Sequence, residues 1–260
     1  MVSGPTVILL PPSEGKAAGG TGSYAWADGQ FPILAAARAQ VGTALAAAVI
    51  SDPASTLGLA GSQLAAAVAV ATFGYVGAPA CPAHDRYTGV VYDALGDSAA
   101  SASVAARARR ELYILSGLLG LVRFDDPTPE YRARVGLRLM LDGQIVTLAA
   151  WWRPHLTAAL IASQPGAVWD VLTTEHRRMI DWTALCEAGI SVHRVEFICA
   201  DGRGAKGHSA KAAKGALVRL ALEEGWEAAR AHLAGGFGSG PLAGAATSFA
   251  RGGGLTVILP

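Results

Sequence analysis

The two ends of the chain carry nearly the same short apolar run. The first, TVILL, occupies residues 6–10, and the second, LTVILP, occupies residues 255–260. Short runs that are rich in β-branched residues and bounded by proline are typical of buried strands. A strand that is apolar on both faces belongs in a sheet that helices cover on both sides. We therefore expect the two runs to be neighbouring central strands of one sheet, which makes residues 1–260 a single domain.

The segments between these runs alternate between helical and strand patterns. Asp142 and Gly143, set between two alternating runs, indicate a hairpin over 138–149. Strands are expected at 167–172 and 192–200, a strand or a loop at 71–75, and loops in the glycine-rich stretch 235–254. Helices are expected at 33–50, 62–70, 99–118, 152–163, 209–225 and 226–234. This mixture predicts an α/β (or α+β) fold with a mixed sheet flanked by helices.

Composition narrows the class of protein. With 52% hydrophobic and 16% charged residues, the chain can bury a substantial core. Its formal net charge of +1 is not that of a dedicated nucleic-acid-binding protein, so any affinity for anions must come from a local patch. Three cysteines without a CxxC pair favour a reduced, cytoplasmic protein with no metal site and no cofactor. We expect no signal peptide and no membrane span, because polar residues, glycine and proline interrupt the apolar segments before the ~18 residues that a span requires.

The stretch PPSEGK, which follows the first apolar run, is similar to a phosphate-binding P-loop but does not meet its requirements. A P-loop has the pattern Gly-x-x-x-x-Gly-Lys-Ser/Thr, because its amides surround phosphates and its hydroxyl binds magnesium. Here a leucine replaces the first glycine and an alanine replaces the hydroxyl residue. The two prolines instead predict a rigid turn that places Ser13, Glu14 and Lys16 at one end of the sheet. That end is a common position for a ligand site.

Lysine is rare in this chain, with four lysines against seventeen arginines. Because an ammonium and a guanidinium are not equivalent, we expect function where lysine is kept. Lys206, Lys211 and Lys214 fall within nine residues near the start of the expected helix 209–225. Ser209 is suited to cap this helix, and the free amides of the first turn together with Lys211 and Lys214 would bind a phosphate. The alternative is a solvated basic helix face.

Arginines gather in residues 115–139, together with three acidic residues. They are Arg123, Arg132, Arg134 and Arg138. One interpretation is a loop held by its own surface salt bridges, each of which contributes about 0–1 kcal/mol. The other is that some of the guanidinium groups face a cleft.

Two further segments suggest function. The first is a polar loop with the residues His84, Asp85, Arg86, Tyr87 and Thr88. Polar loops carry function more often than core segments do, and His84 with Asp85 suits acid–base chemistry, although adjacent side chains point apart. The second is LGLAG at 57–61, which resembles the hairpin of a helix–hairpin–helix DNA-binding module.

Four segments, in this order and spacing, resemble the YaaA family of bacterial peroxide stress proteins. They are LLPPSEGK, RYTGVVYDAL, LYILSGLLGLVRFDDPTPEYRARVGLRL and KAAKGALVRLAL. The third is the most specific, with Glu130 where the family is expected to have proline, and the final third of the chain matches more loosely, with Glu175 the position that transfers. The resemblance extends to Pro260 and implies a single α/β domain with a long positively charged cleft. It also implies binding to duplex or distorted DNA, and protection against hydrogen peroxide linked to lower free iron in the cell.

Two functions are consistent with these residues and with the resemblance. The first is a cytoplasmic, monomeric stress protein that binds DNA without strong sequence specificity. Its anion-binding residues would be Lys16, Arg86, Arg123, Arg132, Arg138, Lys206, Lys211 and Lys214. The second is an enzyme acting on a nucleotide, nucleobase or other small anionic substrate in the same cleft. Its proton-transfer residues would be Glu14, His84, Asp85 and Glu175, with Ser13, Tyr87 and Thr88 beside them. Direct sequestration of iron is a third possibility, for which the sequence offers no ligand set.

Overall fold

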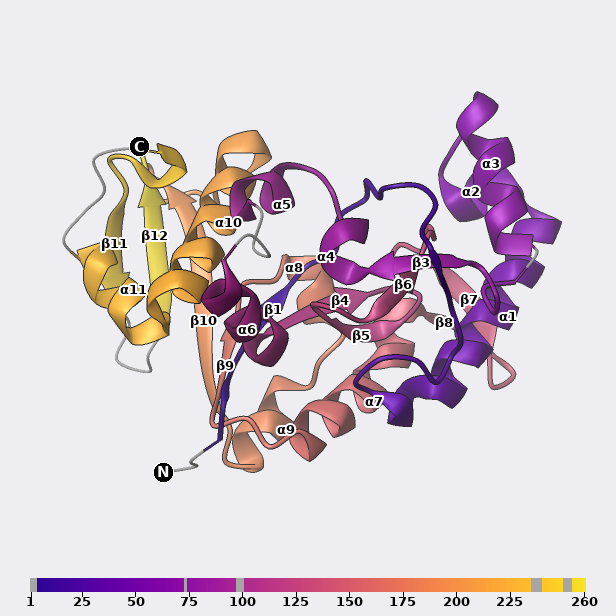
Figure 1. The fold of residues 1–260 in the computed structure, drawn as a ribbon, viewed down its shortest axis with the longest axis horizontal. Coiled ribbons are helices and arrows are strands. Elements are labelled where there is room, and N and C mark those ends of the chain that lie inside the picture. Colours follow the sequence, from indigo (N-terminus) through magenta and orange to yellow (C-terminus); the bar gives the residue numbers. More distant parts are fainter. Residues whose placement is uncertain (1–3, 73, 97–100, 235–239, 250–253) are drawn as a thin grey trace.

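The fold is built on a seven-stranded sheet with the strand order β11-β12-β10-β9-β1-β4-β5 (Figure 1). The computed structural model describes the chain except for residues 1–3, 73, 97–100, 235–239 and 250–253. The strands are β1 (Thr6–Leu10), β4 (Leu112–Ser116), β5 (Gly120–Arg123), β9 (Ala167–Asp170), β10 (Ser191–Cys199), β11 (Ala246–Phe249) and β12 (Leu255–Leu259). Neighbours among β4, β1, β9, β10 and β12 are parallel, whereas the edge strands β5 and β11 are antiparallel. The sheet is therefore mixed, as the sequence predicts.

The two terminal apolar runs lie in this sheet but are not neighbours. Strands β9 and β10 separate β1 from β12, so the expected pairing is wrong. Residues Val7–Leu10 of β1 are fully buried, whereas alternate residues of β12 are only half-buried. An apolar pattern reports the environment of a strand and not its partner.

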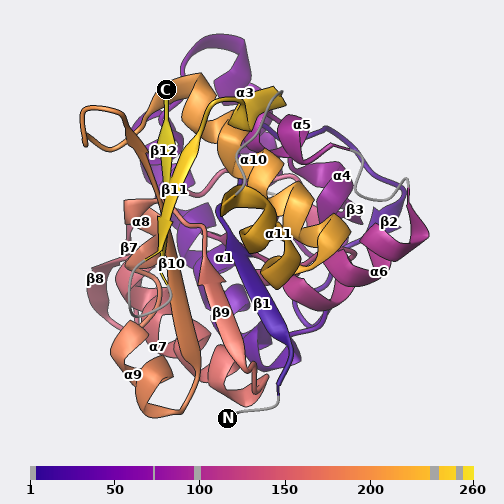
Figure 2. The ribbon, with the colours of Figure 1, turned by 90° about the vertical axis from the view of Figure 1, so that its left-hand side faces the viewer.

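Helices cover both faces of the sheet (Figure 2). The helices of the described residues are η1 (Pro32–Leu34), α1 (Ala35–Ser51), α2 (Pro53–Leu57), α3 (Gly61–Thr72), α4 (Ala83–Arg86), α5 (Val90–Leu95), α6 (Ala102–Glu111), α7 (Leu148–Ala162), α8 (Thr174–Arg177), α9 (Trp182–Glu187), α10 (Gly207–Glu224), α11 (Trp226–Ala234) and η2 (Gly240–Leu242). Helices α5, α6, α10 and α11 lie on one face, and α7 and α9 lie on the other. The expected helices 33–50, 62–70, 209–225 and 226–234 are confirmed, and α7 begins four residues before the expected start at 152.

Two small β-structures complete the fold. Strands β2 (Gly22–Ser23), β3 (Pro79–Pro82) and β6 (Pro127–Pro129) form an antiparallel sheet. Strands β7 (Arg138–Leu141) and β8 (Gln144–Thr147) form the expected hairpin. Its turn residues, Asp142 and Gly143, have φ angles of 48° and 73°, the left-handed conformation that an Asp-Gly turn supplies.

Two other expectations are wrong, and a third is met only in part. The helix expected over 99–118 ends at Glu111, and Leu112–Ser116 forms β4. The segment LYILS has the aromatic and β-branched character of a strand, which the preceding alanines and arginines obscured. Strand β11 lies in the stretch expected to form loops. The segment 71–75, expected to be a strand or a loop, contains the end of α3 at Ala71 and Thr72 and irregular structure at Gly74 and Tyr75.

Helix α1 is more apolar than the sequence analysis allowed. The stretch Pro32–Ser51 is long and apolar enough to cross a membrane by length and composition. One side of it is buried, however, including Arg38, whose guanidinium donates to the carbonyls of Leu119 and Leu121 at 2.9 Å each. These contacts are those of a core helix in a soluble α/β domain.

Candidate functional site at the carboxyl edge of the sheet

The topology singles out the carboxyl ends of β1 and β9. After β1 the chain builds one side of the sheet with β4 and β5, and later builds the other side with β9, β10 and β12. Ligands of open α/β sheets bind where the strand order reverses in this way. The N–H of Val171, just after β9, donates to the carbonyl of Leu9 at 3.1 Å, so the segments that leave these two strands start side by side.

The segment PPSEGK lies against the polar loop 84–88. Lys16 and Tyr87 form an antiparallel β-bridge. The N–H of Thr88 lies 3.2 Å from the carbonyl of Gly15 and 3.1 Å from Oγ of Ser13, and donates to both. A Cβ on Gly15 would lie 2.9 Å from Oγ1 of Thr88, so glycine permits the close approach. Two motifs that are distant in the sequence therefore form one structural unit.

Lys16 is held in this unit by one hydrogen bond and two aromatic rings. Its Nζ donates to the carbonyl of Ser13 at 2.9 Å and lies 4.3 Å from the ring centre of Tyr131 and 5.6 Å from that of Tyr87. Burial, and secondly the charge of Arg132, lower the pKa of Lys16 to about 8. A lysine with this pKa exchanges its charge close to neutral pH, and an anion bound beside it would favour the charged form.

A chain of buried hydroxyl groups lies beneath Lys16. Oγ of Ser116 donates to Oη of Tyr131 at 2.8 Å, and Oη of Tyr131 lies 2.8 Å from Oη of Tyr87. Burial raises the pKa of Tyr131 to about 12 and raises that of Tyr87, so both phenols keep their protons at neutral pH. The three hydroxyl hydrogens share two links, which leaves one O–H without an acceptor among the contacts of the described residues.

A second half-buried lysine lies at the end of β9. Nζ of Lys214 donates to the carbonyl of Val171 at 2.6 Å. Burial and the nearby Arg177 lower the pKa of Lys214 to about 8. His176 lies close by, and its pKa falls to about 4, first through burial and then through the charge of Lys214. Oγ1 of Thr173 lies 2.7 Å from Nδ1 of His176 and fixes the orientation of the ring.

The start of α10 places the other two lysines at the same edge. Helix α10 follows β10, so its first turn lies at the carboxyl edge of the sheet. Lys206, at the N-cap position, and Lys211 are both exposed. The expected cap is wrong, because Ser209 lies inside the first turn and no side chain caps the helix. All four lysines of the chain are thus found at this edge, with free amides of α10 beside two of them.

The arginines expected at the same site mostly bind backbone carbonyls. Arg86 is fully buried and donates to the carbonyls of Thr128, at 3.0 Å, and of Ala17 and Gly19. Its guanidinium holds the loop that follows Lys16, which is a structural task. Arg123 lies at the end of edge strand β5 and donates to the carbonyls of Arg109 and Arg110.

The other arginines of this block are distributed differently. Nε of Arg132 donates to the carbonyl of Leu57 at 2.9 Å, and Arg134 donates to the carbonyl of Ser55 at 3.3 Å, which ties the α2–α3 hairpin to the segment after β6. Arg138 is exposed at the start of β7. The block is therefore held mainly by bonds from arginine to backbone carbonyls and not by salt bridges among its own side chains.

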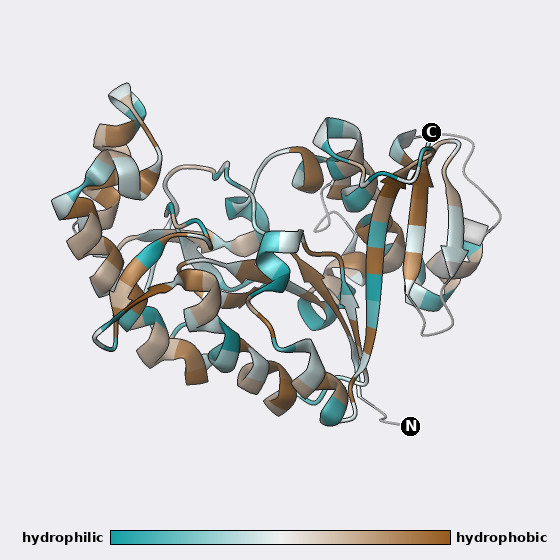
Figure 3. Cartoon of the chain, turned by 180° about the vertical axis from the view of Figure 1, so that it is seen from behind, coloured by the Kyte–Doolittle hydropathy of each residue, from teal (hydrophilic) through white to brown (hydrophobic). Residues whose placement is uncertain are grey.

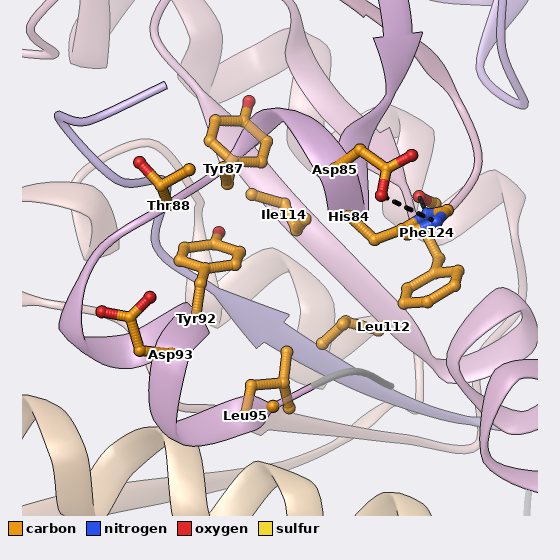
Figure 4. Close-up of a pocket in the computed structure, with 11 residues that line it drawn as sticks. His84, Asp85, Tyr87, Thr88, Tyr92, Asp93, Leu95, Leu112, Ile114 and Phe124 are labelled. Atoms are coloured by element: carbon orange, nitrogen blue, oxygen red, sulfur yellow. Dashed lines mark hydrogen bonds and ion pairs between the residues drawn. The ribbon is translucent and has the colours of Figure 1, made fainter. Parts of the chain in front are cut away.

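The candidate proton-transfer residues do not converge. Glu14 is exposed near Lys16, and its charge opposes the lowering of the pKa of that lysine. Glu175 is exposed on α8, beside His176. Nε2 of His84 lies 3.5 Å from Oδ1 of Asp85. Both residues line a cavity of about 300 Å³ against α5, to which neither Glu14 nor Glu175 contributes (Figure 4). The structure brings His84 together with Asp85, but it does not unite them with Glu14 or Glu175.

Sequence reasoning missed Ser116 and Tyr131, which support Lys16 from below. Ser116 was missed because a helix, and not a strand, was expected over 99–118. The signal that could have revealed it is the strand pattern LYILS, which ends on this serine at the carboxyl edge next to β1. Tyr131 lies in the arginine-rich block 115–139, for which the sequence interpretation considered only the charged residues.

Comparison with known proteins agrees with the motifs in this region. The sequence profile described as "Peroxide stress protein YaaA" matches residues 6–234. The chain belongs to the YaaA family. It is 36% identical over 224 residues to a UPF0246 protein of Streptomyces coelicolor, which covers 84% of each chain. It is 33% identical to a UPF0246 protein of Corynebacterium efficiens over 254 residues, 96% of this chain and 94% of the relative. The family description associates the chain with peroxide stress; the profile starts with β1 and includes all four lysines, but it ends in α11, before β12.

Proposed function

We propose that this YaaA-family protein binds DNA at the carboxyl edge of its sheet as part of the response to peroxide. The observation that carries the proposal is the position of the lysines. All four lie at this edge, although arginines are spread over the whole chain. Binding would come from contacts to phosphates and would have little sequence preference, because such contacts read no bases.

Lys206 and Lys211 are suited to the first phosphate contacts. Both side chains are exposed, and the first turn of α10 leaves amides without side-chain partners. Amides at a helix N-terminus and nearby ammonium groups together favour a phosphate. Lys214, one turn further along α10, and Lys16 would then lie deeper in the same basic cleft.

The α2–α3 hairpin supplies a second surface for the DNA backbone. Gly58 and Gly61 flank its loop with φ angles of 63° and 61°, the left-handed conformation that lets a short loop join two helices. In Figure 3, where the view is reversed, α3 projects at the upper left, and among its residues only Ala71 is buried. The bond from Arg132 to Leu57 connects this hairpin to the neighbourhood of Lys16. Backbone N–H groups of such a loop are common phosphate contacts.

Salt dependence tests the proposal. Binding of a short duplex, with and without an unpaired bubble, would be measured by fluorescence anisotropy between 50 and 200 mM salt. The variant Lys206→Ala/Lys211→Ala should bind more weakly, and the slope of log K against log salt should fall by about two, roughly one for each lost contact. The control Arg110→Ala/Arg153→Ala removes two exposed charges elsewhere and should keep the slope. An unchanged slope in the lysine variant would refute the proposed interface.

The second candidate is an enzyme that acts on a nucleotide-like anion. The specific observation in its favour is Lys16, with a pKa of about 8, above a hydroxyl chain that has one hydrogen to spare. A substrate oxygen could accept that hydrogen. Saturable binding of one nucleotide or nucleobase with little affinity for duplex DNA would favour this function. Glu14→Gln should then abolish turnover while leaving binding intact, and full activity in that variant would remove Glu14 from the mechanism.

A further inference from the structure

The cavity beside α4 and α5 has no part in the proposed DNA interface. It has a volume of about 300 Å³, which is at the small end of the range for ligand pockets. Most of its side chains come from three elements: His84 and Asp85 from α4, Asp93 and Leu95 from α5, and Leu112 and Ile114 from β4. In Figure 4 the rings of Tyr92 and Phe124 and the aliphatic side chains surround the interior, while Asp85 and Asp93 lie at opposite sides.

The interior offers flat apolar surfaces. Tyr92 donates its hydroxyl to the carbonyl of Pro11 at 2.9 Å, so what it presents to the cavity is its ring. The ring of Phe124 is stacked on that of His84, with 4.2 Å between centroids and 9° between planes. Nδ1 of His84 is 2.9 Å from the carbonyl of Phe124, which fixes this stack because the carbonyl accepts the hydrogen bond. The aromatic walls are therefore preorganised for a flat or slender apolar group.

The charge around the cavity is negative. Asp85 and Asp93 are both exposed, and none of the described residues that line the cavity is a lysine or an arginine. Two arginines nearby have carboxylate partners of their own: Arg109 pairs with Asp125, and Nε of Arg219 donates to Glu223 at 2.6 Å. The buried Arg86, next to Asp85, instead donates to backbone carbonyls of residues that do not line the cavity. Two carboxylates next to aromatic faces favour a cation, which both groups attract.

We propose that this cavity binds a small organic cation, with a protonated amine or amidine on an aromatic or short aliphatic body. The apolar body would lie between Tyr92 and Phe124, and the negative charges of Asp85 and Asp93 would both attract the cationic group. The proposal is independent of DNA binding, because it uses neither the lysines nor the start of α10.

Benzamidine is the probe, and benzamide is its neutral counterpart of similar shape. Isothermal titration at pH 7.5 and low salt should show saturable binding of benzamidine and at least tenfold weaker binding of benzamide. Asp85→Asn and Asp93→Asn should each weaken benzamidine binding severalfold, because each removes one of the two charges that attract the cation, and the double variant should weaken it by about tenfold or more. Both side chains are exposed, so the variants should keep the fold, which circular dichroism would verify.

The control Glu187→Gln removes an exposed carboxylate from α9 and should leave the affinity for benzamidine unchanged. Three results would overturn the proposal. They are the absence of saturable benzamidine binding, equal binding of benzamide, and unchanged binding of benzamidine by the double variant Asp85→Asn/Asp93→Asn.

Discussion

The segment Arg86–Thr88 separates two regions of opposite charge. On one side it pairs with the PPSEGK segment and forms the support of Lys16. On the other side Tyr87 and Thr88 line the cavity whose charged groups are Asp85 and Asp93. The first region has ammonium groups on a polar sheet edge, and the second has carboxylates around an apolar interior.

This difference shows why a formal net charge of +1 is a poor guide to the local charge on the surface of the chain. Opposite charges that cancel in the total are separated over a short distance by the fold. Within the positive region the residue type matters as well, because Lys206 and Lys211 are exposed, while arginines such as Arg86 and Arg123 bind backbone carbonyls. A guanidinium is suited to that structural task because it donates several hydrogen bonds in a fixed plane.

The largest effect on stability is expected from Arg86, which lies between the two regions. Arg86→Met would leave the buried carbonyl of Thr128 and the partly buried carbonyls of Ala17 and Gly19 without this donor, and we expect the free energy of unfolding to fall by about 3–4 kcal/mol. Urea denaturation followed by circular dichroism would measure it. DNA and benzamidine binding should both weaken, because the loop after Lys16 and helix α4 depend on the same guanidinium.

The control for this variant is Arg203→Met, which removes an exposed arginine that pairs with Asp201. Its free energy of unfolding should change by no more than about 0.5 kcal/mol. If Arg86→Met keeps wild-type stability but loses DNA binding, then Arg86 is a DNA contact and not a structural residue.

A smaller effect on stability is expected at the contact between α10, which carries two of the lysines, and α5, which lines the acidic cavity. A Cβ on Gly215 of α10 would lie 2.1 Å from the carbonyl of Val91 on α5. Gly215→Ala should therefore push the helices apart and reduce the free energy of unfolding by about 1–2 kcal/mol, because overpacking outweighs the better helix propensity of alanine. Gly136→Ala is the control, since nothing lies within 4 Å of the added Cβ. Equal stability of both variants would show that α5 and α10 adjust without cost.

The sequence predicts these regions unequally. The elements with strong local signals were predictable, such as the Asp142-Gly143 hairpin and the buried strand β1. The position of Lys16 at the carboxyl end of a buried strand was also predictable, because it follows the apolar run at residues 6–10. The hydroxyl chain was not, since it joins Ser116 and Tyr131 through tertiary packing that no local pattern encodes.

The acidic cavity illustrates the same limit. His84 and Asp85 stood out as a polar pair in the sequence, but Asp93 did not, and the apolar interior comes from β4, a segment expected to be helical. The pairing of β1 with β9 rather than with β12 was equally unpredictable. Both the cavity and the strand order depend on tertiary packing between segments that are distant in the sequence.

The pH dependence of DNA binding would sharpen the contrast between lysine and arginine at the positive region. The pKa values of Lys16 and Lys214 are lowered to about 8, so both side chains are charged below that pH and neutral above it. DNA affinity should therefore fall as the pH rises from 7 to 9, by about tenfold if one charged contact is lost. Lys16→Arg/Lys214→Arg should flatten this dependence, because arginine stays protonated, and Lys206→Arg should not. An affinity that is constant from pH 7 to 9 in the wild-type protein would exclude both half-buried lysines from the interface.

The smallest expected effects are the most direct test of whether the two regions are separate. Asp93→Asn should weaken benzamidine binding but change DNA affinity by less than about twofold at physiological salt, where charges beyond ~8 Å are largely screened. Lys211→Ala should weaken DNA binding but change the affinity for benzamidine by less than about twofold. A rise of severalfold in DNA affinity for Asp93→Asn would mean that this carboxylate repels bound DNA, and the acidic cavity would then border the DNA path instead of standing apart from it. The two regions would in that case act as one surface, on which the carboxylates limit how far the phosphate backbone can extend from the lysines.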